Sequence, residues 1–366
     1  MKVLMIAPHH GGINIYVKLL CDELKRNMIE CDHIGSQLSD FPYNVQNKSW
    51  RSSNWAKNKV LELFKDIDFN SYDIIALHYG KNDIEQYLPV LLNKNKATYK
   101  TKFVYFAHYL SRNLFSKYLI DSETAFQIEE LTNTFFDGYV FFGTFAKNHM
   151  NIQSSIAQIV SYLPETHSHE ILSKSDEYKY KKEFNYIEGK TVYWPGYTSN
   201  YKNPEIFLRA LENVKEELNV IFAGRGWEKR LGFKKKNISN SKINIIDREI
   251  NSNEFKFLVE HSLFGIFPYQ QPLDKDEIFQ GSGVLPNYIY SGKATIVFNE
   301  GCLAEYVGDS GIVVEKTDIS SFAQAIGKLC NNKDRAQYEE KSKNRSNLFS
   351  IATHSTQIKK FFTQLI

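Results

Sequence analysis

Short apolar runs alternate with longer amphipathic segments along most of the chain. Residues 2–7 form a nearly continuous apolar run, a glycine pair follows at Gly11 and Gly12, and apolar side chains then recur at helical spacing over residues 13–24. Continuous apolar runs are typical of parallel strands buried on both faces, and such strands need a crossover connection, usually a helix. The pattern predicts a doubly wound α/β fold.

This strand, loop and helix pattern occurs in two series. The first ends near residue 164 and the second begins near residue 190, whereas residues 167–188 are charged and lack a strand pattern. Because 366 residues exceed one ordinary core, we expect two domains, at residues 1–168 and 169–347, with a final helix at 348–366 that packs back on the first domain. The expected strands lie at 2–7, 72–79, 103–108, 137–143, 159–164, 190–196, 218–222, 243–246, 263–267, 294–298 and 311–314, and the expected helices at 13–24, 55–64, 204–214, 255–259, 319–329 and 349–365.

Two strands expected in the first domain each end in a histidine, His78 and His108. Open parallel sheets bind ligands at the carboxyl ends of their strands, which favours a functional role for the pair. For each histidine alone, a satisfied core residue is the competing interpretation. His108 is the stronger candidate because polar residues follow it at 111–113.

The segment 267–298 predicts a strand, a polar loop, a glycine turn, a helix and a further strand. Its turn, Gly281, Ser282 and Gly283, would lie at the start of the helix, where unpaired N–H groups suit a phosphate or a carboxylate. Glycine at these positions lets a ligand approach the backbone closely. An ordinary surface turn is the simpler interpretation of this tripeptide taken alone.

Composition narrows the class of protein. The net charge of +3 gives no indication of a nucleic-acid partner. The four cysteines show no metal-binding spacing, which favours a reduced compartment, and no stretch approaches the roughly 20 apolar residues of a membrane span. We therefore expect a cytoplasmic protein. The basic run 229–236 leaves open a peripheral contact with anionic lipid at the inner face of the membrane, with a solvated surface as the alternative.

The order of these motifs resembles the retaining glycosyltransferases of the GT-B fold, in particular glycosyltransferase family four. The resemblance covers nearly the whole chain, and its most specific part is the run 281–307, GSGVLPNYIYSGKATIVFNEGCLAEYV. It implies two Rossmann-like domains that face each other across a cleft. The other matching features are the Gly11–Gly12 loop, the strand that ends at His108, the Gly196-x5-Lys202 segment and the turn at 220–226.

Positions that match the family imply roles for individual residues. Lys202 matches the lysine that contacts the donor diphosphate, and His108 matches the histidine near the transferred sugar, so both are catalytic candidates. Gly12 lies in the loop that approaches donor and acceptor. Ser282, Gly283 and Val284 match the backbone that holds the distal phosphate. The candidate donor-binding set is Gly12, Gly196, Lys202, Arg225, Gln280, Gly281, Ser282, Gly283, Val284 and Asn287.

The chain departs from the family pattern at charged positions. The two glutamates usual in the family correspond to Phe279 and Asn287, and the arginine expected after Gly196 is Tyr197. We expect Asn287 to contact a ribose hydroxyl, Gln280 to reach a sugar and Arg225 to supply the missing cation. Because Lys202, the helix start at Ser282 and Arg225 could stabilise the diphosphate charge without a metal, we expect no metal requirement and no cofactor.

The resemblance implies transfer of a hexose, with retention, from a nucleoside diphosphate sugar, a UDP-sugar being the simplest case. The acceptor would be a glycan, a lipid-linked molecule or a protein. The missing glutamates and arginine favour an alternative, a catalytically inactive GT-B-like partner or glycan-binding subunit of a glycosyltransferase complex. A sugar-nucleotide epimerase of related fold is a third interpretation. Homo-oligomers and hetero-oligomers both stay open.

Overall fold

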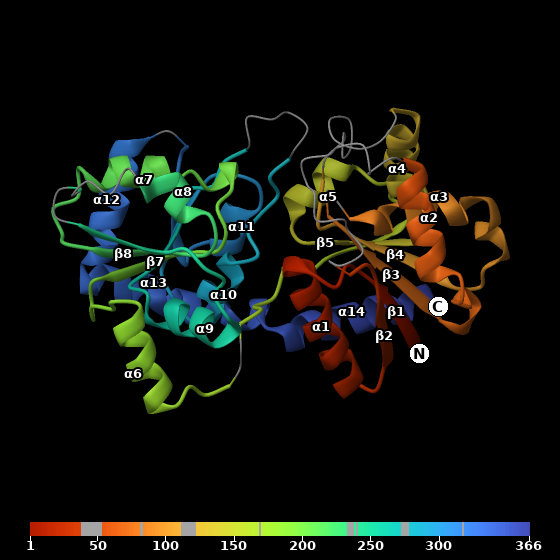
Figure 1. The fold of residues 1–366 in the computed structure, drawn as a ribbon, viewed down its shortest axis with the longest axis horizontal. Helices are drawn as coiled ribbons and strands as arrows, with labels where there is room; N and C mark the ends of the chain where they lie inside the picture. The colour runs from red at the N-terminus through yellow and green to blue at the C-terminus, as the bar shows by residue number, and fades with distance from the viewer. Residues whose placement is uncertain are drawn as a thin grey trace. The chain divides into compact units, whose positions relative to one another are not determined.

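A computed structural model describes residues 1–37, 53–80, 83–110, 122–167, 170–232, 238, 241–271, 278–316 and 318–366. The polar residues 111–113 and residues 233–236 of the basic run lie outside this set. The chain divides into two compact units (Figure 1). Unit 1 comprises Met1–Tyr162, Leu273–Gln280 and Ile351–Ile366, and unit 2 comprises Leu163–Pro272 and Gly281–Ser350. Within the described residues, no helix combines the length and apolar character needed to cross a membrane.

Unit 1 is built on one six-stranded parallel sheet. The strand order is β2-β1-β3-β4-β5-β6, so β1 has β2 on one side and β3 on the other. The direction of winding changes at β1, and loops leave the sheet there in opposite directions, which is where open sheets of this kind bind ligands. The strands are β1 (Lys2–Ile6), β2 (Glu30–Ile34), β3 (Ile74–His78), β4 (Lys102–Phe106), β5 (Gly138–Phe141) and β6 (Ala157–Val160).

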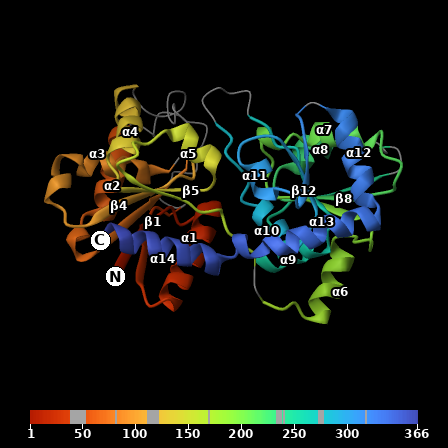
Figure 2. The ribbon, with the colours of Figure 1, turned by 180° about the vertical axis from the view of Figure 1, so that it is seen from behind.

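Helices cover both faces of this sheet. On one face, α1 packs against α14, which Figure 2 shows from behind, although α14 follows all of unit 2 in the sequence. The helix α1 begins at Gly11, so the glycine pair forms the first turn of the helix rather than a separate loop. The helices are α1 (Gly11–Arg26), α2 (Ser53–Phe64), α3 (Leu88–Leu92), α4 (Ser122–Thr134), α5 (Thr144–Met150) and α14 (Ile351–Leu365), with short 3-10 segments at Phe69–Ser71, Ile84–Tyr87 and Asn93–Thr98.

Aromatic side chains fill the core on the other face of the sheet. Tyr105 on β4 lies 4.8 Å from Tyr79 and 5.2 Å from Phe136 between ring centroids, and all three rings are buried. Offset and edge-on contacts of this kind stabilise a core beyond the area they bury. Much of the high tyrosine and phenylalanine content of unit 1 therefore serves packing.

Unit 2 contains two three-stranded parallel sheets, with strand orders β7-β8-β9 and β10-β11-β12. They adjoin where the segment before β10 meets β7, because Leu263 N donates to Thr191 O at 2.7 Å and Tyr193 N donates to Ser262 Oγ at 3.0 Å. The strands are β7 (Thr191–Pro195), β8 (Asn219–Ala223), β9 (Lys242–Ile246), β10 (Gly265–Phe267), β11 (Thr295–Phe298) and β12 (Gly311–Val314).

Four helices of unit 2 were not expected from the sequence: the short α8 and α11, and the longer α6 and α13. Helix α6 lies in the charged segment interpreted as a connection, and α13 follows α12 where no apolar stripe is present. Each buries a single residue, Tyr180 in α6 and Ser342 in α13, so neither shows the periodicity that reveals a helix. The helices are α6 (Lys174–Glu183), α7 (Pro204–Leu211), α8 (Trp227–Leu231), α9 (Ser252–His261), α10 (Leu285–Tyr290), α11 (Leu303–Val307), α12 (Ile319–Cys330) and α13 (Asn332–Arg345), with 3-10 segments at Asn200–Lys202 and Ser346–Phe349.

One strand boundary differs clearly from the expectation. The run 159–164 was expected to be a strand, but β6 covers Ala157–Val160. After Ser161, Leu163 N donates to the Tyr306 hydroxyl at 3.2 Å and Glu165 N donates to Phe349 O at 2.8 Å. The chain has left the sheet at this point, and Tyr162 and Leu163 are only partly buried.

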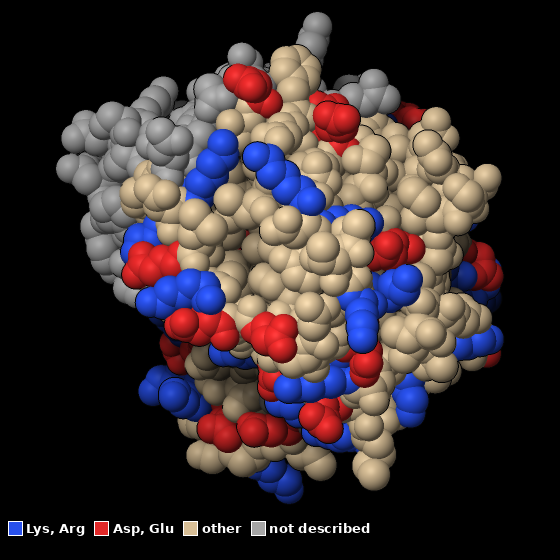
Figure 3. Space-filling view, turned by 90° about the vertical axis from the view of Figure 1, so that its right-hand side faces the viewer, with Lys and Arg blue, Asp and Glu red and all other residues tan. Residues whose placement is uncertain are grey.

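The face of unit 1 in Figure 3 carries both signs of charge. Lys and Arg side chains lie among Asp and Glu side chains across this view. Within unit 1, Lys96 Nζ and Asp137 Oδ1 form an ion pair 3.4 Å apart. A surface that binds nucleic-acid phosphates gathers its basic side chains in one patch or stripe. The described part of this face lacks such a patch.

Candidate functional site

Lys202 is a buried lysine in the segment that follows the carboxyl end of β7. It ends the 3-10 turn Asn200–Lys202, and Pro204 then begins α7 after the left-handed Asn203. The residue is 5% exposed, and its Nζ donates to Pro195 O at 2.8 Å. No other hydrogen-bond partner of this ammonium group is present among the described residues. A cation this deeply buried is normally paired with an anion.

Glycine at 196 and 224 allows two loops to meet beside this lysine. Gly196 has a φ of 81°, and a Cβ there would lie 2.9 Å from Lys202 Nζ. Gly224 has a φ of 139°, and a Cβ there would lie 2.4 Å from Gly196 O. A side chain at either position would be strained and would collide with its neighbour. The two glycines therefore keep the backbone close to the ammonium group.

Burial lowers the pKa of Lys202 to about 7, and the nearby charge of Arg230 adds to the effect. Arg230 is itself neutralised, because its guanidinium makes hydrogen bonds of 3.1 and 2.8 Å to the two carboxylate oxygens of Glu205. It also donates to Ser199 O at 2.6 Å. Arg230 thus holds the loop that carries Lys202, and Lys202 remains the site's cation without an acidic partner among the described residues.

Arg225, the candidate for the missing cation, lies in the loop after β8. Its main-chain oxygen accepts from Thr198 N at 3.2 Å, which links it to the loop after β7. Its side chain is 65% exposed and pairs with Glu249 at 2.6 Å. An exposed pair of this kind contributes little to stability. Arg225 can therefore exchange Glu249 for another anion at low cost.

The turn at 281–284 leaves space beside its two glycines, and its serine caps the start of α10. A Cβ at Gly281 would meet only Cys302 at 3.9 Å, and one at Gly283 would meet nothing within 4 Å, so packing does not require either glycine. Ser282 Oγ accepts from Val284 N at 3.1 Å and from Leu285 N at 3.3 Å. The Ser282 hydroxyl therefore already accepts from two of the N–H groups at the helix start that were expected to bind a phosphate.

Asn287 is fully buried and its amide is engaged inside unit 2. Its Oδ1 accepts from Thr166 N at 2.7 Å and from His167 N at 2.9 Å, and it lies 3.0 Å from His167 Nδ1. Its Nδ2 donates to Gly283 O at 3.0 Å. The side chain thus fixes residues 166–167 to the start of α10. A ribose contact at Asn287 would require these bonds to break.

His108 lies in unit 1, two residues after the end of β4. Its ring packs 4.7 Å from Phe142 and 5.2 Å from Tyr16 between centroids, and burial lowers its pKa to about 3. Gln280 also belongs to unit 1, where its Nε2 donates to Ala107 O at 2.8 Å, next to His108. His108 is thus a neutral imidazole held in an aromatic box.

The candidate residues divide between the two units. His108, Gln280 and Gly12 belong to unit 1, and the remaining candidates belong to unit 2. Gly12 is exposed in the first turn of α1, and a Cβ there would meet nothing within 4 Å. Within unit 2, the structure brings together Gly196, Lys202 and the loop of Arg225. Among the described residues, no group of three or more histidines, cysteines or acids has an arrangement that could hold a metal ion.

Sequence reasoning missed two buried polar groups of unit 1. The first is His354 on α14, whose ring nitrogens lie 2.7 Å from the Tyr16 hydroxyl and 2.7 Å from Ser161 Oγ. The second is Glu85, which is fully buried and accepts from Ser36 N at 2.6 Å with Oε1, whereas its Oε2 has no partner among the described residues. Burial and the neighbouring Asp83 raise the pKa of Glu85 to about 7. Neither residue lies in a motif that would have singled it out.

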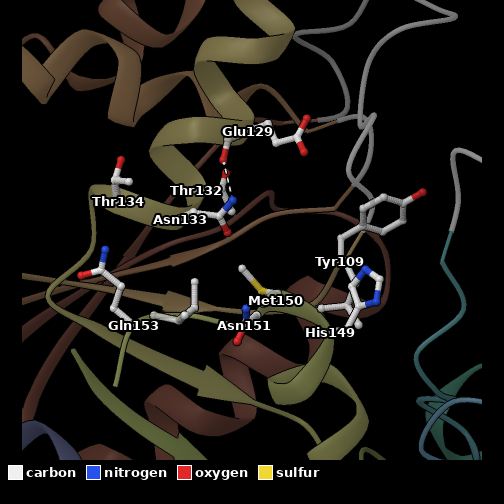
Figure 4. Close-up of a pocket in the computed structure, with 11 residues that line it drawn as sticks. Tyr109, Glu129, Thr132, Asn133, Thr134, His149, Met150, Asn151 and Gln153 are labelled. Atoms are coloured by element: carbon white, nitrogen blue, oxygen red, sulfur yellow. Dashed lines mark hydrogen bonds between the residues drawn. The ribbon is translucent and has the colours of Figure 1, made fainter. Parts of the chain in front are cut away.

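A polar cavity of about 430 Å³ lies in unit 1 between α4 and the end of α5. Figure 4 shows side chains of α4 on one side of it and residues 149–153 on the other. The described lining contains no lysine or arginine. It is formed by Tyr109, Leu110, Glu129, Thr132, Asn133, Thr134, His149, Met150, Asn151, Ile152 and Gln153. Its first residue directly follows His108 in the sequence.

The parallel, doubly wound units define an α/β protein of the class that binds ligands at strand ends. Similarity to solved structures narrows the fold class. The chain matches a sucrose-phosphate synthase from Thermosynechococcus elongatus with a TM-score of 0.74 and 14% identity, covering 100% of this chain and 99% of that one. It matches Anabaena Alr3699/HepE in complex with UDP-glucose with a TM-score of 0.69 and 14% identity, covering 100% of both chains.

A glycosyltransferase from Rickettsia africae matches with a TM-score of 0.70 and 15% identity, covering 100% of this chain and 98% of that one. These likenesses confirm the expected fold class, that of GT-B glycosyltransferases with Rossmann-like domains. Residues 189–332 match the family model described as glycosyl transferases group 1, so the chain carries a domain of that kind. A search of curated proteins found no match.

Proposed function

We propose that this protein transfers a hexose from a UDP-sugar to a glycan-bearing acceptor, with retention of configuration. The observation that carries the proposal is Lys202, a buried ammonium group whose one hydrogen-bond partner among the described residues is the neutral Pro195 carbonyl. Burying a cation without a counter-charge costs several kcal/mol, so such a residue is a candidate for a functional role. A donor diphosphate would supply the missing negative charge.

The proposed chemistry depends on charge that develops on the leaving group. As the bond between the sugar and the diphosphate breaks, negative charge accumulates on the departing phosphate oxygen. A fixed ammonium in a site shielded from water stabilises that charge more than water would. The glycines at 196 and 224 allow the donor to approach, and the open glycines at 281 and 283 leave the neighbouring backbone accessible. Because Lys202 supplies this cation, we expect transfer to continue in the presence of a chelator.

The choice of donor is supported by the structural likenesses. Anabaena Alr3699/HepE was solved in complex with UDP-glucose and also with UDP. It shares the fold with this chain, at 14 and 15% identity in those two structures. Retention and the wider family assignment rest on the motif resemblance between residues 281 and 307. We therefore choose UDP-glucose as the first donor to test.

The acceptor side of the proposal uses the polar cavity of unit 1. Its described lining offers amides, hydroxyls, one imidazole and one carboxylate, without a lysine or arginine to attract an anion. Asn133, Asn151 and Gln153 supply amide groups, and Tyr109 supplies an aromatic ring. Ligand sites of this size fix orientation with a few well-placed polar groups. A neutral sugar unit fits this chemistry better than a phosphate or an acyl chain does.

The decisive experiment compares two lysine variants in the presence of UDP-glucose. Lys202→Ala should abolish both the thermal stabilisation by donor and its turnover, because a ligand raises the melting temperature only if it binds the native state. Lys190→Ala is the matched control, since this lysine of the same unit is 49% exposed and pairs with Glu217. Equal turnover in the two variants would refute the site. NMR of the product's anomeric proton would test retention.

One observation favours a second function, a non-catalytic subunit that binds a glycan or a partner enzyme. Phe279 is buried, and Asn287 is committed to internal hydrogen bonds, so neither position offers the carboxylate usual in the family. A protein of this kind would bind oligosaccharide by calorimetry but show neither heat nor product with any UDP-sugar. Donor binding with turnover would exclude it.

A further inference from the structure

We propose that His78 is a positioning residue that fixes the tautomer of His108, with the proton on Nε2 and a bare Nδ1 that accepts a hydrogen bond from a hydroxyl of the sugar substrate. The inference deepens the proposed function, because it assumes that His108 meets the sugar. It concerns a contact inside unit 1, so it can be tested separately from donor binding at Lys202.

Met5 on β1, His78 on β3 and His108 just after β4 are linked by side-chain contacts. His78 ends β3 and is fully buried, with its ring stacked 4.1 Å from Phe106 between centroids. Its Nδ1 lies 3.1 Å from His108 Nε2. Its Nε2 lies 3.3 Å from the thioether sulfur of Met5 on β1. The ring of His78 therefore has one strong partner and one weak partner.

The weak partner decides which nitrogen of His78 carries the proton. A thioether sulfur has lone pairs and no hydrogen, so it can accept a hydrogen bond but cannot donate one. If His78 Nε2 were bare, two lone pairs would face each other in a buried contact. The favoured tautomer has the proton on Nε2, directed at Met5, and a bare Nδ1. That Nδ1 can only accept, so His108 must donate to it from Nε2.

A neutral imidazole carries one proton on its two ring nitrogens, and in His108 that proton lies on Nε2. Burial keeps both His78 and His108 neutral, since it lowers the pKa of each, that of His108 to about 3. With its proton on Nε2, His108 presents a bare Nδ1, which has no hydrogen-bond partner among the described residues. The next partner of this nitrogen must bring a hydrogen.

The adjoining network around His354 has its own proton order and does not compete for His108. Ser161 donates to Gln357 Oε1, so Ser161 Oγ can accept from His354 Nδ1. His354 Nε2 is then bare and accepts from the Tyr16 hydroxyl. Tyr16 contacts His108 through its ring, at a centroid distance of 5.2 Å, and its hydroxyl is directed at His354. Tyr16 therefore shapes the box around His108 without setting its protons.

This assignment has a consequence for the ligand. A bare imidazole nitrogen accepts from a sugar hydroxyl, but a carboxylate at the same place would set negative charge against a lone pair. A site in which this nitrogen faces C6 of the sugar should therefore accept a hexose and reject the corresponding uronic acid. UDP-glucose and UDP-glucuronic acid form the matched pair, because they differ at one carbon of the sugar.

The tautomer can be measured directly in the intact protein labelled with ¹⁵N-histidine. Long-range ¹H–¹⁵N spectra distinguish protonated from bare ring nitrogens, and His108 should show a protonated Nε2 and a bare Nδ1. His78→Phe removes the acceptor and should give a mixture of tautomers, whereas His78→Asn places an amide oxygen near the former Nδ1 and should restore the single form. Tyr16→Phe, a change in the same box, should leave the His108 spectrum unaltered.

Kinetics supply the second measurement. His78→Phe should lower kcat by about tenfold, the effect of one hydrogen bond, with the KM for UDP-glucose unchanged. His78→Asn should recover most of that loss. A protonated Nδ1 in the wild type, or one unchanged tautomer in all variants, would overturn the proposal.

Discussion

Replacing Lys202 with methionine should make the protein more stable while it destroys the proposed donor site. Lys202 has a pKa lowered from 10.5 to about 7 by burial. Each pKa unit corresponds to about 1.4 kcal/mol, so the protonated lysine lowers the free energy of unfolding by about 5 kcal/mol at pH 7 and below. Methionine has a similar length and no charge, and it therefore removes this penalty.

The gain is reduced by the partner that the variant leaves behind. Pro195 O would lose its 2.8 Å hydrogen bond, and an unsatisfied buried acceptor costs about 1–3 kcal/mol. The expected net gain at pH 7 is therefore about 2–4 kcal/mol. A group whose folded pKa is lowered loses its proton on folding, so the wild type becomes more stable as the pH rises from 7 to 10.5. The advantage of the variant should shrink by about 1.4 kcal/mol per pH unit, vanish between about pH 8.5 and pH 10, and reverse near pH 10.5, where the unsatisfied Pro195 carbonyl leaves the variant less stable.

Urea unfolding at pH 6, 7, 9 and 10 would measure this trend, with the midpoint and slope recorded at each pH. Lys190→Met is the control, because this exposed lysine pairs with Glu217 and should change stability little at any pH. Lower stability of Lys202→Met at pH 7, or a gain that does not depend on pH, would refute the claim that this lysine is held at a cost. Stability that is surrendered at one residue in this way is common at functional sites.

Three further predictions concern unit 1. Glu85→Gln should raise the free energy of unfolding by about 3 kcal/mol at pH 8 and by about 1 kcal/mol at pH 5. The pKa of the Glu85 carboxyl is raised to about 7, so its ionisation destabilises the wild-type protein increasingly as the pH rises above 4.5. Equal gains at both pH values in urea titrations would contradict this. Burial lowers the pKa of His354 to about 3, so the unfolded state takes up a proton at this residue between pH 7 and pH 5 and the folded state does not. The free energy of unfolding of the wild type should therefore fall by about 2 kcal/mol over this range, and His354→Gln should remove that loss. Asn133→Ala should raise the KM for a neutral glycan acceptor and leave donor binding unchanged, whereas Gln127→Ala, elsewhere on α4, should alter neither; an unchanged acceptor KM would exclude the cavity.

Most strands and their order of appearance could be predicted from the sequence, because fully buried strands are apolar throughout. The edge strand β2 was missed, because its sequence, Glu30–Ile34, includes charged and polar side chains. All five residues of β3, β7 and β8 are buried, and the apolar face of α7 is equally plain in its sequence. Helices that cover little of the core gave no such signal. Helix α13 buries Ser342 alone, so tertiary context rather than periodicity determines where it forms.

The candidate site could be predicted as a set of positions but not as a set of interactions. Spacing placed Lys202 beside Gly196, and the structure shows them in contact. Spacing did not show that Asn287 Oδ1 accepts hydrogen bonds from the backbone N–H groups of residues 166 and 167, since those partners are 121 and 120 residues away. The sequence placed His78 and His108 at the ends of two strands, but the direct contact between their rings depends on the register between β3 and β4, which the sequence does not show.

The position of α14 bears on how the protein is made. Unit 1 starts at the first residue, yet its sheet is covered on one face by residues 351–366, which the ribosome adds after all of unit 2. Until then, Tyr16 and Ser161 lack the His354 that joins them, and the apolar surface later covered by Phe362 is exposed. A nascent chain in this state invites chaperone binding. A fragment that stops at residue 350 should resemble it and aggregate.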